Sequence, residues 1–221
     1  MSVHRFFRAA LLAGGVSLLA ACATPPQPFD YSAYKASRPA SILVLPPLNN
    51  STDINASASV LAQVTQPLAE SGYYVLPVTL MTETFRNNGL TVAADIHDVA
   101  PAKLRQIFGA DAALYIGISR YGASYTVFDS AAIVSAEARL VDLRSGQVLW
   151  SGSASASSAE QNNNNQGGLV GLLVTAIVKQ VLNNLTDKSH QVAGVATGRL
   201  LSARPPNGLL YGPRSPKFGT D

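Results

Sequence analysis

Alternation of apolar and polar side chains predicts the most distinct strands of the chain. In residues 114–119 and 134–140 every second side chain is apolar, which is the period of a strand with one buried face. A turn at 144–146, ending in Ser-Gly, separates the second of these strands from another at 148–155. This spacing predicts an antiparallel hairpin. Trp150, the only tryptophan, falls in the hairpin, where we expect it to pack rather than to act.

Shorter apolar runs and helical spacings fill the rest of the pattern. Residues 41–45 and 73–78 are apolar runs that predict buried strands, and Pro46-Pro47 ends the first because proline cannot donate to a sheet. The polar stretches 49–55 and 157–168 predict loops. Apolar residues at helical spacing predict helices over 56–70 (bent in its last turn by Pro67), 81–88, 101–108, 169–185 and 191–201.

The order of these elements is β-α-β-α-α-β, then a β-hairpin, then α. Helices that cluster with a mixed sheet predict an α/β fold, a two-layer domain in which a mixed β-sheet is packed by helices. We place this domain at residues 41–202. A proline-rich tail, 203–221, either wraps the domain or stays loose.

The first 40 residues predict a targeting segment and a spacer. Basic residues, an apolar run and small residues follow one another in 1–21, the order of a secretory signal peptide, and the run is too short to span a bilayer. Prolines at 25, 26, 28 and 39 predict that 22–40 is an extended tether.

Cys22 is the only cysteine, so it cannot form an internal disulfide. It follows Leu19-Ala20-Ala21 at the end of the signal segment, which resembles a bacterial lipobox. The resemblance implies that the Cys22 thiol takes a diacylglycerol, that cleavage occurs before it, and that the new amine is acylated. Several acyl chains would hold the protein on the membrane. Ala23, where an aspartate would favour retention, points to the outer membrane in the enterobacterial sorting pattern.

Cleavage also changes the charge balance. Sixteen lysines and arginines become fourteen when Arg5 and Arg8 are removed, against thirteen acids, so the mature chain has a net charge of about +1. No basic run is interleaved with aromatic residues. We therefore expect no nucleic-acid partner.

Candidate catalytic residues are few. Asp95, His97 and Asp98 lie together and could form half of a metal site or an acid–base pair, but no further ligand has suitable spacing, so we read a solvated loop before the 101–108 helix. No nucleophile elbow or phosphate-binding glycine loop occurs. The carboxylate pairs Glu70 with Glu83 and Glu137 with Asp142 are interpreted as solvated surface charge. We expect no enzymatic activity, cofactor or metal.

Several segments together resemble a known family. They are PASILVLPPLNNSTDINA, QPLAESGYYVLPV, IFGADAALYI, ARLVDLRSGQVLW and LLSARPPNGLLYGPRSP, and they span about Pro39 to Pro216. They are similar to a family of proteobacterial lipoproteins of unknown function, of which one neisserial member was put forward as a vaccine antigen. The resemblance implies a mixed α/β domain similar to the N-terminal domain of TolB and the periplasmic domain of CsgG. It also implies self-association and a link to secretion or surface assembly, and it carries over no catalytic residue.

These observations predict an outer-membrane lipoprotein facing the periplasm, surface exposure being the other option. We expect a non-enzymatic protein-interaction module that assists secretion or assembly of a surface structure, with a CsgG-like secretion lipoprotein as a candidate partner. The alternative is a lipoprotein that binds peptidoglycan or another envelope glycan through Tyr115, Tyr121 and Tyr125, unless these tyrosines only cover a sheet face. A hydrolase is disfavoured by the shortage of bases and nucleophile motifs.

The helix predicted over 169–185 is apolar on all sides in its first half. Leu169, Leu172 and Leu173 point the same general way as Lys179 and Gln180 and need cover. The cover could be the C-terminal tail, the bilayer surface or another subunit. Because the tail offers few apolar groups, we predict that these leucines form a self-association surface of a homo-oligomer.

Overall fold

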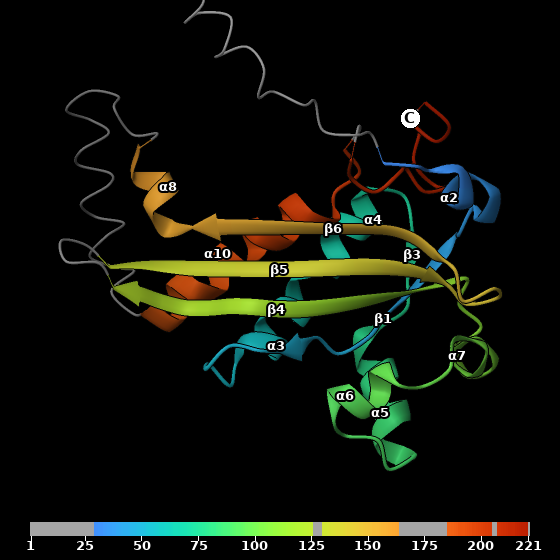
Figure 1. Ribbon diagram of the computed structural model, residues 1–221, viewed down its shortest axis with the longest axis horizontal. Coiled ribbons are helices and arrows are strands. Elements are labelled where there is room, and N and C mark those ends of the chain that lie inside the picture. Colours follow the sequence, from blue (N-terminus) through green and yellow to red (C-terminus); the bar gives the residue numbers. More distant parts are fainter. Residues whose placement is uncertain (1–28, 126–129, 164–184, 205–206, 221) are drawn as a thin grey trace, which may run out of the picture.

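A six-stranded mixed sheet runs through the centre of the protein (Figure 1). The computed structural model describes residues 29–125, 130–163, 185–204 and 207–220. The strand order is β3-β1-β4-β5-β6, and β2 pairs with β4 off this path. The strands are β1 (Ser41–Val44), β2 (Leu48–Asn49), β3 (Tyr74–Val75), β4 (Ala112–Tyr125), β5 (Ser130–Asp142) and β6 (Val148–Ser157).

Strand direction divides the sheet into two parts. Neighbours β3, β1 and β4 are parallel, and β2 is also parallel to β4. The pairs β4–β5 and β5–β6 are antiparallel, so the predicted hairpin and the predicted mixed sheet are confirmed. Gly146 ends the hairpin turn with φ +74°, a conformation that glycine adopts readily.

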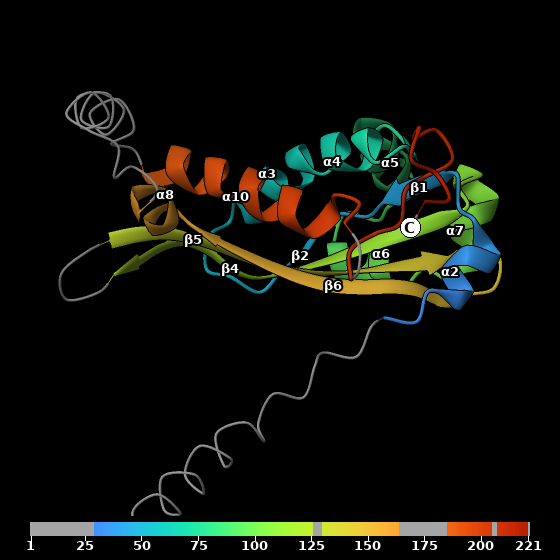
Figure 2. The same ribbon diagram turned by 90° about the horizontal axis from the view of Figure 1, so that it is seen from above.

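One face of the sheet is covered by three helices, α3 (Ala56–Gln63), α4 (Thr65–Glu70) and α10 (Leu185–Leu201) (Figure 2). The main core lies between them and the sheet. Alternate residues of the strands point into it, as the sequence pattern predicts. Among them are Ile42, Val44, Leu114, Ile116, Ile118, Val134 and Leu140.

The other face is covered only at one end. There, α5 (Val78–Asn87), α6 (Ala93–His97) and α7 (Pro101–Phe108) pack on the remaining side chains of β1 and the start of β4. Leu43, Leu45 and Tyr115 belong to this second cluster. The expectation of a single buried face for 114–119 is therefore wrong at Tyr115, because this helical cluster covers it.

One helix prediction and one strand prediction are wrong next to a proline. The helix expected over 56–70 is divided into α3 and α4 at Val64, upstream of the expected bend. Pro67 has no N–H to donate to the carbonyl of Gln63, which interrupts the helical ladder one turn earlier. The strand expected over 73–78 ends at Val75, because Pro77 precedes the first turn of α5.

The predicted tether contains a short helix. α2 (Ser32–Ser37) places Tyr34 in the main core, where only 2% of it is exposed. The Tyr34 hydroxyl is 2.7 Å from that of Tyr73. The prediction of an extended tether through residue 40 is therefore wrong over 32–37. This segment is helical, and the buried Tyr34 side chain attaches it to the domain.

The second half of the chain differs from prediction in two places. α8 (Ser158–Asn163) begins inside the expected polar loop, and α10 starts at Leu185, earlier than the predicted 191. The helix predicted over 169–185 lies, before Leu185, outside the described residues. The described part of the tail wraps the domain: Leu209 and Leu210 are buried in the main core.

Candidate functional site

The uncovered part of the sheet is a polar surface made by β4, β5 and β6. The outward positions of β5 and β6 carry Ser135, Glu137, Arg139, Ser151 and Ser153, all exposed or half-buried. Their alternation with buried residues is visible in the sequence and follows from the two-residue period of a strand. This side of the hairpin therefore faces solvent.

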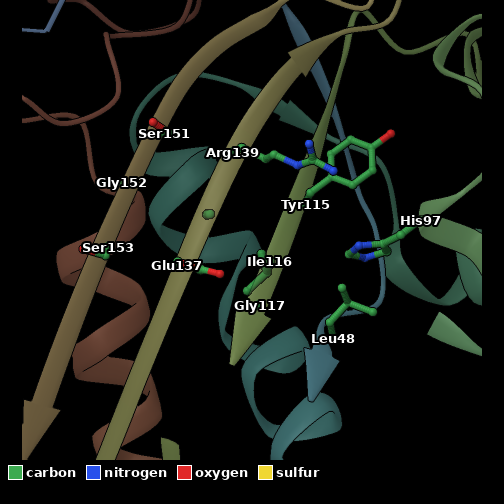
Figure 3. Close-up of a pocket in the computed structure, with 11 residues that line it drawn as sticks. Leu48, His97, Tyr115, Ile116, Gly117, Glu137, Arg139, Ser151, Gly152 and Ser153 are labelled. Atoms are coloured by element: carbon green, nitrogen blue, oxygen red, sulfur yellow. The ribbon is translucent and has the colours of Figure 1, made fainter. Parts of the chain in front are cut away.

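A groove of about 620 Å³ lies on this surface (Figure 3). Its floor is formed by the middle of the three strands, and its wall by Leu48 of β2 and His97 of α6. Gly117 lowers the floor, since a Cβ there would be 3.3 Å from Oε1 of Glu137. We call this hollow the sheet groove. Its lining residues are Leu48, His97, Tyr115, Ile116, Gly117, Glu137, Ala138, Arg139, Ser151, Gly152 and Ser153.

Three side chains from distant parts of the chain are stacked at one end of the sheet groove. The Arg139 guanidinium carbon is 4.7 Å from the centroid of the Tyr115 ring. The His97 ring meets Tyr115 edge-on, with centroids 5.1 Å apart and an interplanar angle of 85°. Burial raises the pKa of Tyr115, and the positive charge of Arg139 lowers it by less. The phenol therefore stays protonated at neutral pH.

His97 is held by the backbone rather than exposed in a loop. Its Nε2 donates to the carbonyl of Pro46 at 2.8 Å, and because a carbonyl can only accept, the neutral ring carries its proton on Nε2. Burial lowers its pKa from 6.5 and the charge of Arg139 adds to this, while the Pro46 hydrogen bond and Asp98 oppose it. The solvated-loop interpretation is wrong here because 93–97 form α6, which packs Ile96 into the second cluster.

Glu137 and Arg139 give the sheet groove two opposite charges. They lie two residues apart on one side of β5, a spacing of about 7 Å. Neither forms an ion pair with another described residue. An approaching molecule can therefore pair with a carboxylate and a guanidinium at once, with serine hydroxyls beside them.

The other carboxylates singled out in the sequence do not form pairs. Asp142 is 4% exposed and accepts hydrogen bonds from Ser37, Arg144 and Ser145, so its interpretation as solvated charge is wrong. Burial alone would raise its pKa, but these donors and the charge of Arg144 lower it. Asp142 thus holds the hairpin turn and α2 together. In the described ranges no three metal-ligating side chains cluster.

The three tyrosines of the glycan alternative do not form one surface. Tyr115 belongs to the second cluster and Tyr121 to the main core, on opposite faces of β4. A β-bulge between Ile118 and Arg120 adds one unpaired residue, Ser119, and reverses which face the later residues point to. The proposed tyrosine groove is therefore wrong for this pair, and the side chain of Tyr125 lies outside the described set.

No pattern in the sequence indicates that Ser59 and His190 would meet. Ser59 Oγ is 2.7 Å from Nδ1 of His190, and the other ring nitrogen is 2.8 Å from the Gln63 amide nitrogen. This pair ties α3 to α10. Its third member is an amide, which cannot stabilise an imidazolium as the carboxylate of a catalytic triad does.

The remaining candidates lie outside the described ranges. Cys22 precedes Phe29, the first described residue, and Leu169, Leu172 and Leu173 fall between 163 and 185. Both the lipid attachment and the self-association surface therefore stay predictions. Among the helices that the structure describes, none has the length and apolar character needed to cross a membrane.

Comparison with known proteins identifies close relatives. Residues 29–214 match the family described as "Putative lipoprotein GNA1162-like". The "Putative lipoprotein NMB1124/NMB1162" of Neisseria meningitidis serogroup B is 54% identical over 200 residues, which are 90% of this chain and 92% of that protein. The crystal structure of lipoprotein GNA1162 from Neisseria meningitidis is similar with a TM-score of 0.52 and 55% identity, covering 66% of this chain and all of that one. These matches confirm the resemblance seen in the sequence motifs.

A weaker likeness connects the fold to PelC from Paraburkholderia phytofirmans, solved as a dodecamer. Its TM-score is 0.43 and its identity 14%, over 73% of this chain and 86% of that chain. At this level of similarity it says nothing about function or assembly.

Proposed function

Because the chain belongs to the GNA1162-like lipoprotein family, we propose that it is an outer-membrane lipoprotein whose periplasmic domain binds another envelope protein and catalyses no reaction. Attachment through Cys22 is supported by its place after Leu19-Ala20-Ala21 at the end of a signal-like segment. Ala23 supports the outer membrane as the destination. Several acyl chains, each methylene contributing about 0.8 kcal/mol, make such an anchor effectively permanent.

The sheet groove is the observation that carries the binding role. Helices cover one side of the β4–β5–β6 sheet and leave the other side hollow, with Glu137 and Arg139 unpaired among the described residues. Exposed opposite charges with small hydroxyl side chains beside them suit a protein segment of complementary charge, because both signs must be matched in one register. The partner segment therefore carries a basic and an acidic side chain about 7 Å apart.

A protein partner is favoured over a substrate by the chemistry of the groove. Burial raises the pKa of the Tyr115 phenol, so this group keeps its proton at neutral pH, and His97 donates its Nε2–H to a backbone carbonyl. Ser153 lies opposite Glu137 on β6, but among the described residues neither its hydroxyl nor that of Ser151 is hydrogen-bonded to the Glu137 carboxylate. This inventory binds and orients but offers no paired nucleophile and base.

The wider role follows the family resemblance. We place the protein in secretion or assembly of a surface structure, with a CsgG-like secretion lipoprotein as the candidate partner. Self-association through Leu169, Leu172 and Leu173 belongs to the same proposal and rests on the sequence alone.

Charge exchange in the sheet groove tests the binding role. The variant Glu137→Arg with Arg139→Glu keeps the net charge and the exposed positions, so the fold is expected to be retained. Affinity purification from native membranes should recover a partner with the parent chain and lose it with this variant. The control, Lys103→Glu with Glu83→Lys on α7 and α5, should retain the partner. Equal recovery with the groove variant would contradict the proposal.

The anchor has its own test. Cells supplied with a fatty-acid probe should label the parent and leave a Cys22→Ser variant unlabelled and released from membranes. A labelled, membrane-bound Cys22→Ser protein would contradict attachment at this residue.

A further inference from the structure

Helix α2 lies beside the C-terminal tail (Figure 1), and the two line a second hollow that shares no residue with the sheet groove. The hollow has a volume of about 280 Å³. Lys35 of α2, Arg38 at its C-cap, and Tyr211 and Phe218 of the tail are among the residues that line it. Arg214 and Lys217 lie on the same tail. We call these six residues the basic aromatic patch.

The patch is held on a fixed backbone. The Tyr73 hydroxyl donates to the carbonyl of Leu210, the backbone N–H of Gly212 donates to Ser71 at 2.8 Å, and that of Arg214 donates to Gly72 at 3.0 Å. The tail approaches so closely that a Cβ on Gly212 would be 2.5 Å from the oxygen of Gly72. The positions of the tail cations are therefore set by the fold.

The cations of the patch are exposed, and two of them lie over aromatic rings. Arg214 is 5.0 Å from the ring centroid of Tyr74, and Lys217 is 5.5 Å from that of Tyr211. Within the described part of the chain, Arg38, Arg214 and Lys217 form no ion pair with a carboxylate. Asp30, at the start of α2, accepts from the backbone of Ser32. Positive charge is thus concentrated here on a mature chain with little net charge.

Arg38 occupies a position that favours glycine. Its φ is +46°, and no other non-glycine residue of the described chain has a positive φ. The strain is greater because Pro39 follows, and a residue before proline prefers extended backbone. Glycine would adopt this C-cap conformation readily. Backbone strain of this kind clusters at functional positions, which supports a functional surface here.

The patch adjoins the point where the chain comes from the membrane. Phe29 donates from its backbone to Oδ1 of Asn207 at 3.3 Å, and the Tyr31 hydroxyl donates to the carbonyl of Gly208. Residues 23–28 alone separate Phe29 from Cys22. An extended chain spans at most about 3.5 Å per residue, so this spacer limits the separation to about 25 Å. The end of the domain that carries α2 and the tail must therefore stay near the bilayer.

We propose that the basic aromatic patch binds the headgroups of anionic phospholipids in the membrane that holds the anchor. The proposal rests on lipid attachment at Cys22 for its geometry. Lysine and arginine pair with lipid phosphates, and exposed Phe218 and the tyrosines suit the interfacial zone between headgroups and acyl chains. Such contact fixes which side of the domain faces the bilayer.

The test uses residues 22–221 with Cys22→Ser, so that no acyl chain contributes. It should sediment with vesicles containing phosphatidylglycerol, less so at high salt, and not with vesicles of phosphatidylcholine alone. Each basic residue near an anionic surface contributes about a fivefold gain in binding. The variant Arg38→Gly with Lys217→Gln should therefore bind about 30-fold more weakly, with a Tm no lower than the parent's.

The matched control is Lys103→Gln with Arg120→Gln, which removes two exposed cations of α7 and β4 and should bind as the parent does. No binding by the parent, or equal loss in both double variants, overturns the proposal. So does binding to polyglutamate without binding to vesicles, which would indicate an acidic protein segment. Because no acyl group is present, these outcomes are independent of whether Cys22 is lipidated in cells.

Discussion

Trp150 and Gly152 lie on one side of β6, and the glycine makes room for the indole. A Cβ at Gly152 would lie 2.4 Å from Cζ2 of Trp150, whose Nε1 donates to the carbonyl of Asn207 at 3.0 Å. The ring is 1% exposed. This contact joins the hairpin to the tail, so Trp150 packs as the sequence predicts.

We expect Gly152→Ala to destabilise the protein by about 1–3 kcal/mol, because the added methyl forces the indole out of its site. Urea unfolding followed by tryptophan fluorescence measures this. The control is Gly117→Ala in the same sheet, where the nearest atom belongs to the exposed Glu137 side chain, which can move. A Gly152→Ala protein as stable as the control would show that the indole site is not tightly packed.

His97 should make the stability depend on pH. Its pKa is lowered in the folded state from 6.5, chiefly by burial, so the unfolded chain binds the proton more readily. The stabilisation is present above 6.5 and is lost as the pH falls through the lower, folded-state pKa. Asp111 and Asp142, whose pKa values are also lowered from 3.8, add a loss only at lower pH.

Unfolding curves collected from pH 7 downward should therefore differ between the parent and His97→Gln. The parent is expected to lose stability in the window just below 6.5, and the variant to lose less there. Parallel curves over that window would mean that His97 does not titrate differently in the two states.

Arg38 offers a prediction of the opposite sign. The left-handed conformation costs an ordinary residue about 1–2 kcal/mol, whereas glycine adopts it freely but is more flexible when unfolded. Arg38→Gly should raise the free energy of unfolding by about 0.5–1 kcal/mol. Urea denaturation provides the value, and a loss of stability would indicate that the Arg38 side chain supports the fold more than its backbone strains it.

Among the elements, the tail depends on two glycines in contact. Gly72, with φ +97°, and Gly212 bring the α4–β3 connection and the tail together without side chains between them. Gly212→Ala should separate them and expose Arg214 and Lys217 to trypsin. Gly89→Ala, which strains a residue with φ +80° but has no atom within 4 Å, is the control. Equal trypsin resistance of Gly212→Ala and the parent would argue against this close contact.

The sequence predicts elements well where local chemistry decides them. Pro101 and Gly109 define α7, and the Ser-Gly turn defines the hairpin. It fails where a distant segment decides. The bulge at Ser119 has no glycine or proline to indicate it, yet it reverses the facing of Tyr121. The two-residue strand β2 is another example. It forms because the chain runs alongside β4 after Pro46-Pro47, and nothing in its own two residues indicates a strand.

The candidate site shows the same limit. Alternation along β5 could place Glu137 and Arg139 outward together, because both follow the strand period. The same pattern could not predict the contact of His97 with Tyr115. That contact depends on α6 packing on the sheet, where Ile96 joins the second cluster. Local pattern thus predicts the charges of the groove but not its wall.

In the whole molecule, the arrangement of helices determines where a partner can bind. α3, α4 and α10 cover one sheet face, and α5, α6 and α7 cover one end of the other. The remaining surface is the sheet groove, with its unmatched pair of charges. At the end near Phe29, the basic aromatic patch faces the proposed membrane. We therefore propose that the anchor and the patch together hold the domain in a fixed orientation while its open sheet face binds.

Photo-crosslinking in living cells tests the central claim, that the sheet groove binds a protein partner. A photoreactive phenylalanine analogue replaces Ser153 in the groove. In a control protein it replaces Thr79, an exposed residue of α5. The account predicts a discrete crosslinked protein band from position 153, absent from position 79 and lost when Glu137 and Arg139 are exchanged. Adducts of equal intensity at both positions, or none at position 153 in a folded and membrane-bound protein, would contradict it.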